Sequence, residues 1–132
     1  MVNIIDQYAK EIQEELKVDE FNIKEVSMKT PGRKHHWVTK LINHKKRLID
    51  LKAERFNLKK EIAKQIIQQS PVKITLPLAE KTAYQHERMV ELQTRIDEQE
   101  LAVEFLEKVE KTFSSLSFDI KNIVEIMKME TL

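Results

Sequence analysis

The chain of 132 residues, 41% hydrophobic and 34% charged, is long enough for one domain and polar enough to solvate long helices. One glycine and three prolines leave little to interrupt a helix, so the composition predicts an all-α fold. Without cysteine there is no disulfide or thiolate metal site, and no apolar run reaches the roughly 20 residues that span a bilayer. These features predict a soluble, intracellular protein with no membrane-spanning segment.

The net charge of +1 conceals three blocks of alternating sign. Residues 1–28 carry a net −4, residues 29–64 a net +9, and residues 65–132 a net −4. A basic block between two acidic ones creates a local positive potential that attracts polyanions.

Residues 1–30 are expected to form a short N-terminal helix followed by an irregular linker. The helix is indicated by an apolar stripe at helical spacing, made of Ile4, Ile5, Tyr8, Ile12 and Leu16. Thr30 and Pro31 then resemble an N-cap and a proline at the first helical position.

Residues 31–69 are expected to form one basic helix with two apolar seams. The first seam runs through Trp37, Leu41, Leu48, Leu51, Leu58 and Ile62, and the second through Val38, Ile42, Ile49, Phe56 and Ala63. Two seams indicate two packing partners, one from the same chain and one from a neighbouring subunit.

Residues 70–132 are expected to form a short extended linker and a long C-terminal helical region, within one domain. Ser70-Pro71 ends the basic helix, and alternating apolar residues follow up to Pro77, which can start the next helix. No proline or glycine follows Leu78, and Ser114–Ser117 is the expected place for a bend, although whether the helix is continuous there stays open.

Helices of this length leave too little chain to cover their own apolar faces. The sequence therefore predicts a helical hairpin or bundle that assembles into a homo-oligomer. The alternative is a monomeric hairpin that buries both seams.

The basic helix carries its cations in rows, with Lys45, Lys52 and Lys59 recurring every seven residues between the seams. Such rows can neutralise the phosphates of a nucleic acid, with Trp37 or Phe56 offering a stacking face, although both aromatics are more often core. The cations could instead pair with acidic helices of this chain or lie on an anionic membrane. The candidate nucleic-acid-binding residues are Arg33, Lys34, Lys45, Lys46, Lys52, Arg55, Lys59 and Lys60.

The sequence shows no catalytic or metal-binding pattern. There is no glycine-rich phosphate loop, and His35, His36 and His44 lack the spacing and acidic partners of a metal site. We expect no enzyme, no cofactor and no metal, and we expect His44 to be a seam residue satisfied by a hydrogen bond.

Four segments together resemble the UvsY family of recombination mediator proteins of T-even-type bacteriophages: "IQEELKVDEF", "TPGRKHHWV", "LKAER" followed by an aromatic, and "SFDIKNIVEIMK". The resemblance implies a small helical protein that forms a ring-like homo-oligomer in the cytoplasm of the infected host cell. It also implies binding of single-stranded DNA and help for the recombinase UvsX in displacing single-strand-binding protein.

The family's Leu-Lys-Ala-Arg element most resembles Leu51, Lys52, Ala53 and Arg55 here, with Glu54 inserted, while a second register uses Leu58, Lys59 and Lys60. The tyrosine and glycine that follow the family's basic helix are replaced by "AKQIIQQSP". Similarity to the family's terminal helix implies that oligomer contacts come from Phe118, Ile120, Ile123 and Met127.

The leading hypothesis is a mediator that binds single-stranded DNA and promotes loading of a recombinase filament. The alternative is a helical assembly or scaffold protein whose cations pair across subunits.

Overall fold

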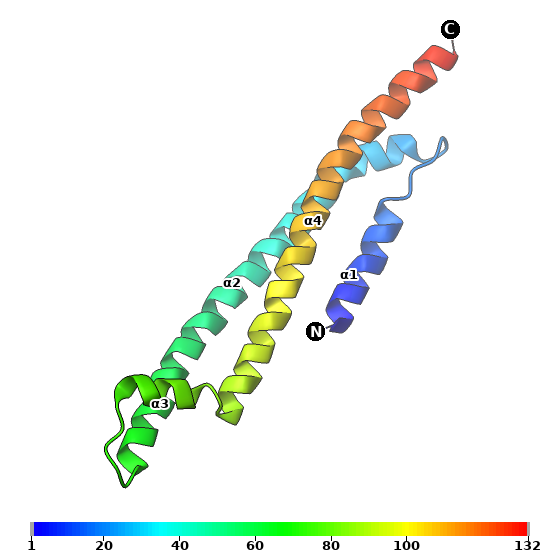
Figure 1. Cartoon of the computed structure of the whole chain (residues 1–132). Coiled ribbons are helices and arrows are strands. Elements are labelled where there is room, and N and C mark those ends of the chain that lie inside the picture. The colour runs from blue at the N-terminus through cyan, green and yellow to red at the C-terminus, as the bar shows by residue number, and fades with distance from the viewer. Residues whose placement is uncertain (1, 132) are drawn as a thin grey trace. The chain divides into compact units, whose positions relative to one another are not determined.

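The computed structural model describes residues 2–131 and contains four helices in that range. They are α1 (Val2–Glu15), α2 (Ile23–Gln69), α3 (Leu76–Ala83) and α4 (Glu87–Glu130), shown in Figure 1. The predicted all-α class is confirmed, and the two long helices pack against each other as a hairpin. The ring-like assembly is a property of several chains and stays a prediction.

The chain divides into two compact units, and both long helices contribute to each. Unit 1 consists of residues 1–43 and 102–132, and unit 2 of residues 44–101. Each has its own apolar core. The single-domain division expected from the sequence stays a prediction.

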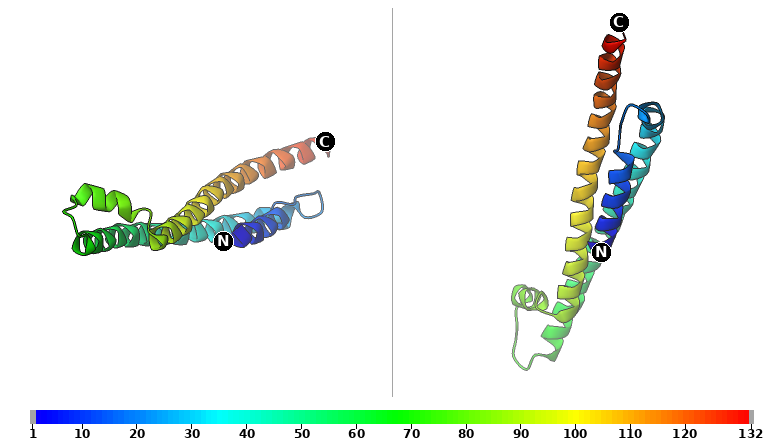
Figure 2. Two further views of the ribbon diagram at one scale, coloured as in Figure 1. Left: turned by 60° about the horizontal axis from the view of Figure 1, so that its bottom comes forward. Right: turned by 90° about the vertical axis from the view of Figure 1, so that its right-hand side faces the viewer.

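The core of unit 1 is centred on Trp37, whose side chain is fully buried. Its indole Nε1 donates a 2.8 Å hydrogen bond to Glu15 Oε2, and the Tyr8 ring meets it edge-on with centroids 5.3 Å apart. Leu106 and Phe113 of α4 pack in the same cluster. Because these contacts join α1, α2 and α4, the indole fixes the N-terminal helix against the hairpin (Figure 2).

Unit 2 packs the middle of α2 against the start of α4. Its core contains Leu51, Leu58 and Ile62 of α2, Ala83 of α3, and Met89, Leu92 and Ile96 of α4. His44 Nδ1 lies 2.7 Å from Oε1 of the buried Gln99. The predicted role of His44 as a hydrogen-bonded seam residue is therefore confirmed.

Helix α2 begins at Ile23, so the prediction of a start near Pro31 was wrong. Asp19 Oδ1 accepts hydrogen bonds from the backbone N–H groups of Phe21 and Asn22, and Asn22 Oδ1 accepts one from Asp19 N–H at 2.7 Å. This reciprocal pattern resembles a capping box and starts the chain into helix before Ile23. The helix therefore begins eight residues earlier than predicted, at residue 23 instead of residue 31.

Pro31 lies inside α2, where it removes one backbone hydrogen bond. The turn before it is held by burial of Ile23 and Val26 against Ile120 of α4. The buried Thr30 hydroxyl also donates a 2.6 Å hydrogen bond to the Val26 carbonyl. Packing therefore overrides the local preference of proline for a helix start.

Between α2 and α3, residues 70–75 form neither helix nor strand. Ser70 Oγ donates to the Val72 carbonyl at 2.8 Å, and Val72 itself is 68% exposed. The segment is thus an irregular connection with a bend at residues 71–72, rather than a strand. Pro77 lies in the first turn of α3, as the sequence predicted.

The second break in the chain falls at residues 84–86, and α4 is one continuous helix through Ser114–Ser117. His86 Nδ1 accepts a 3.1 Å hydrogen bond from Arg88 N–H and so caps the first turn of α4. Ser114 and Ser117 instead donate to carbonyls four residues earlier, Glu110 and Phe113. Serine hydroxyls bond back in this way within continuous helices, and α4 continues through both residues.

Candidate nucleic-acid interface

The two predicted seams of α2 have different surroundings. Most of the first seam is buried against this chain's own helices, which confirms a packing partner within the chain. The second seam is largely uncovered, with exposed fractions of 43% for Ile42, 67% for Ile49 and 52% for Phe56, although Ala63 is buried. The prediction of Phe56 as a core residue was wrong, whereas Trp37 is core as expected.

In unit 2 the uncovered seam merges with exposed cations, and we call the resulting surface the open face. Its members are spaced three or four residues apart along α2, so they share one side of the helix. They are Lys46, Ile49, Ala53, Phe56, Lys60, Lys64 and Ile67, all of them exposed.

Phe56 is the aromatic of the open face, and lysines surround its ring. Lys60 Nζ lies 4.3 Å from the ring centroid, and Lys59 Nζ lies 5.3 Å from it. A half-exposed ring beside two ammonium groups offers a stacking surface for a base next to charges for its phosphate. Proteins that bind single-stranded nucleic acid commonly combine these two features.

The predicted row of Lys45, Lys52 and Lys59 is partly engaged within unit 2. Lys52 Nζ lies 3.5 Å from Glu100 Oε1, and Lys59 Nζ lies 3.9 Å from Glu80 Oε2. The Lys52 pair is exposed on both sides, so it contributes no more than about 1 kcal/mol and can exchange for a phosphate. Lys59 is more enclosed, and Lys45 is half-buried.

Arg55 is half-buried beside Tyr84, with its guanidinium carbon 5.2 Å from the ring centroid. Lys59 Nζ lies 5.8 Å from the same ring. Sequence reasoning missed Tyr84, which comes from the break between α3 and α4. The sequence did contain a signal for such a residue, namely the arginine at an apolar seam position. A buried guanidinium needs a partner such as an aromatic face.

The other two candidate cations belong to unit 1, apart from the open face of unit 2. Arg33 Nη1 donates a 3.0 Å hydrogen bond to the Glu15 carbonyl at the end of α1. Lys34 is half-buried. Arg33 therefore has a structural role in joining α1 to α2.

The four candidate assembly residues lie near the end of α4 but differ in exposure. Ile120 is buried with Ile23 and Val26, and Met127 packs against the same cluster. Phe118 and Ile123 are 65% and 37% exposed. Only these last two present substantial apolar surface outward.

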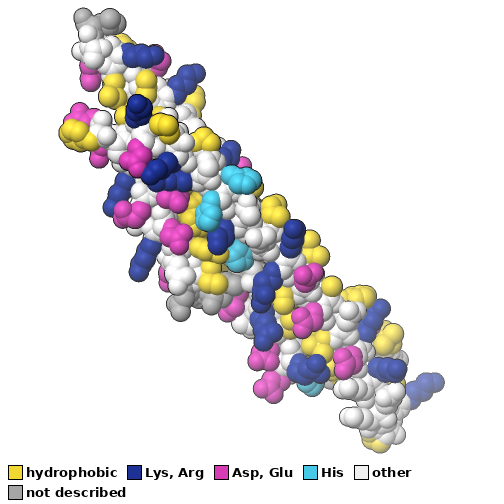
Figure 3. Space-filling model, turned by 180° about the vertical axis from the view of Figure 1, so that it is seen from behind, with side chains coloured by type: hydrophobic (Ala, Val, Ile, Leu, Met, Phe, Trp, Pro, Cys, Tyr) yellow, Lys and Arg dark blue, Asp and Glu magenta, His cyan; other side chains and the backbone are white. Residues whose placement is uncertain are grey.

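Charges of both signs share the surface drawn in Figure 3, where lysine and arginine side chains lie among hydrophobic and acidic ones. On α2, a side-chain hydrogen bond from Lys29, together with its positive charge, lowers the pKa of the exposed Glu25 carboxyl. Among residues 2–131 no group of three His, Asp or Glu side chains could hold a metal ion. Within the same range, no helix has the length and apolar character needed to cross a bilayer.

Taken together, the fold and site define an all-α protein built on two long helices, with an aromatic and basic surface along one of them. Crystal structures of the bacteriophage T4 recombination mediator protein UvsY have this fold. In lattice type IV the TM-score is 0.82 at 13% sequence identity, covering 96% of this chain and 98% of that one. In lattice type II the TM-score is 0.80, also at 13% identity, with coverage of 96% and 97%.

No protein-family model matches the sequence, and no curated protein matches it at the sequence level. The resemblance to UvsY expected from the sequence is confirmed in the fold.

Proposed function

We propose that this protein is a recombination mediator that binds single-stranded DNA and promotes loading of a recombinase filament against single-strand-binding protein. The observation that carries the proposal is the open face, where Phe56 is 52% exposed and Lys60 Nζ lies 4.3 Å from its ring. The likeness in fold to the T4 recombination mediator supports the role.

Within the open face we assign the main phosphate contacts to Lys46 and Lys60, with Lys64 extending the surface. All three are exposed, and no ion pair among residues 2–131 engages them. Lys52 and Lys59 must first leave Glu100 and Glu80, and Arg55 is half-buried. The register that contains Lys59 and Lys60 is therefore favoured over the one that contains Lys52 and Arg55.

We further propose that several copies assemble, in a ring-like homo-oligomer, so that each subunit presents one open face. Phe118 and Ile123 supply uncovered apolar surface on α4 for such contacts. Several weak phosphate sites held together bind a strand avidly without reading its sequence. Mediation then needs no bond-making, because the oligomer stabilises a DNA conformation that the recombinase prefers.

A salt series with single-stranded and double-stranded DNA tests the proposal. The triple variant Lys46→Ala, Lys60→Ala, Lys64→Ala should lower the slope of log affinity against log salt by about 2, at roughly 0.7 per lost contact. The control is Lys111→Ala with Lys121→Ala, which removes exposed cations of α4. An unchanged slope in the triple variant, or equal loss in the control, would refute the assignment.

The second candidate is a helical assembly protein whose cations stabilise packing. The Lys52–Glu100 and Lys59–Glu80 ion pairs show that cations of α2 pair with acidic helices within the chain, and this candidate requires similar pairs between subunits. It predicts that Lys52→Ala with Lys59→Ala dissociates the oligomer in light scattering while no nucleic acid co-purifies. The mediator predicts an intact oligomer.

A further inference from the structure

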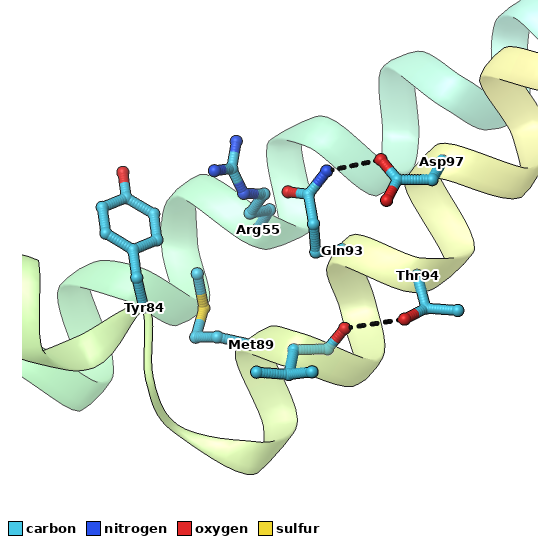
Figure 4. Close-up of a pocket in the computed structure, with 7 residues that line it drawn as sticks. Arg55, Tyr84, Met89, Gln93, Thr94 and Asp97 are labelled. Atoms are coloured by element: carbon cyan, nitrogen blue, oxygen red, sulfur yellow. Dashed lines mark hydrogen bonds between the residues drawn. The ribbon is translucent and has the colours of Figure 1, made fainter.

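A groove of about 410 Å³ lies in unit 2 where α3 runs beside the last turns of α2 (Figure 1), and we call it the α3 groove. A second cavity of unit 2, of about 600 Å³, has a polar wall, in which Gln93 Nε2 donates a 2.8 Å hydrogen bond to Asp97 Oδ1 beside Arg55 (Figure 4). The α3 groove is lined by Lys60, Lys64, Ile67 and Gln68 of α2 and by Leu76 and Glu80 of α3.

The α3 groove presents aliphatic surface that this chain leaves uncovered. Ile67 and Leu76 line it, and both are exposed, as are Val72 in the connection between the helices and Leu78 in α3. Within residues 2–131, the side chains that line the groove include no aromatic ring, so a base finds no stacking partner there. Aliphatic grooves are typical sites for the apolar side chains of a short protein segment.

The rim of the α3 groove is mainly basic. Lys60 and Lys64 are exposed on its α2 side, and Lys73 is exposed in the connection between the helices. The one acid in the lining described for residues 2–131 is Glu80, whose Oε2 lies 3.9 Å from Lys59 Nζ, so its charge is partly compensated. The local charge therefore attracts carboxylates.

The start of α3 adds to this positive potential. Thr75, its N-cap residue, makes no side-chain capping hydrogen bond to the described part of the chain. The backbone N–H groups of the first helical turn have no acceptor within the helix, and negative charge is stabilised beside them. Leu76, which lines the groove, is the first residue of this turn.

We propose that the α3 groove binds an acidic segment of a partner protein, with apolar side chains against Ile67 and Leu76 and carboxylates beside Lys60 and Lys64. The same two lysines belong to the open face, where Lys60 Nζ lies 4.3 Å from the Phe56 ring. A carboxylate and a phosphate then compete for the same ammonium groups. The competition rests on the proposed function, and it gives a partner protein a means to release the strand from the open face.

Fluorescence anisotropy tests the site with a labelled peptide of about 12 residues that combines glutamates with leucines at helical spacing. The intact protein should bind this peptide. It should bind a version with lysine for glutamate, or with serine for leucine, at least about tenfold more weakly. No binding of the acidic leucine peptide, or equal binding of either altered version, would overturn the proposal.

Leu76→Ser should weaken peptide binding about fivefold or more, because it removes an apolar contact of the groove. It should leave the affinity for a dT strand unchanged, because it removes no cation. The control Leu101→Ser replaces a leucine of similar exposure on α4 and should change neither affinity. Unchanged peptide affinity in Leu76→Ser would overturn the site. A weaker dT affinity would assign the groove to DNA, and dissociation of the oligomer in light scattering would assign it to a second copy; either result would overturn the proposal.

An unlabelled dT strand added to the peptide complex at low salt tests the competition. The strand should displace the labelled peptide from the wild-type protein. Simultaneous binding of strand and peptide would overturn the shared use of Lys60 and Lys64. If no strand binds at low salt while the peptide still binds, the proposed function fails and the docking site stands.

Discussion

Replacing Phe56 by leucine removes the exposed ring of the open face while keeping an apolar side chain of similar bulk. The ring is 52% exposed, and a base that stacks on it would contact the ring beside the Lys60 ammonium group. Stacking of one base on an aromatic contributes about 1–3 kcal/mol, which corresponds to a loss of roughly 5- to 150-fold in affinity. The fold should lose less than about 1 kcal/mol, because a half-exposed ring has little burial to lose.

The assay is anisotropy of a labelled dT strand of ~16 nucleotides. It should be paired with light scattering, because lost assembly would also weaken binding. Ile49→Ala is the matched control, since Ile49 lies on the same face and is 67% exposed but carries no ring. It should leave DNA affinity nearly unchanged. Wild-type affinity in Phe56→Leu, or dissociation of the oligomer in both variants, would show that the open face is a protein interface.

Three further predictions concern unit 1. Trp37→Phe should lower the free energy of unfolding by about 2–4 kcal/mol in urea titrations, because it shrinks a fully buried ring and removes the bond to Glu15; a loss below ~1 kcal/mol would contradict this role. Pro31→Ala should raise the free energy of unfolding by about 1–3 kcal/mol, because it restores a helical hydrogen bond; a lower melting temperature would refute that reasoning. Burial, and secondarily the charge of Glu11, raises the pKa of the Tyr8 phenol above 10.0. The neutral phenol therefore stabilises the fold below pH 10, and this contribution is lost as the pH rises through the raised pKa. Tyr8→Phe should flatten the fall in the free energy of unfolding between pH ~9 and ~11, and an unchanged profile would exclude Tyr8 as its cause.

Much of the fold follows from what the sequence lacks. With so little glycine and proline, long helices were predictable, and the end of α2 at Gln69 agrees with Ser70-Pro71. The start of α2 was not predictable from Pro31, because a proline preceded by threonine has the same local signature at a helix start as inside a packed helix. Contacts of Val26 with distant Ile120 decide between the two.

The break at residues 84–86 was missed for a related reason. We expected serines to break the helix, but the Ser114 and Ser117 hydroxyls donate hydrogen bonds back to their own helix. The break lies instead before α4, whose first turn is capped by His86. Histidine is a weak capping signal in a sequence. The misplaced break also hid Tyr84, which lies within it.

For the candidate site, periodicity showed that two seams exist but not which one the chain covers itself. Leu51 and Phe56 both recur at helical spacing, and only the position of α4 makes the first buried and the second exposed. The roles of Lys52 and Lys60 were inseparable in the sequence for the same reason. Their difference comes from Glu100, which lies opposite Lys52.

The way the chain is divided between the two units has a consequence for the order in which they fold. Unit 2 is one uninterrupted stretch of chain, residues 44–101, whereas unit 1 joins residues up to 43 with residues from 102 onward. Closing a short loop costs less entropy than closing a long one, and local contacts form faster than distant ones. The hairpin of unit 2 should therefore form first and bring the two parts of unit 1 together. During synthesis on the ribosome, Trp37 must then wait for Phe113 to emerge, so the open face takes shape before the core of unit 1 is complete.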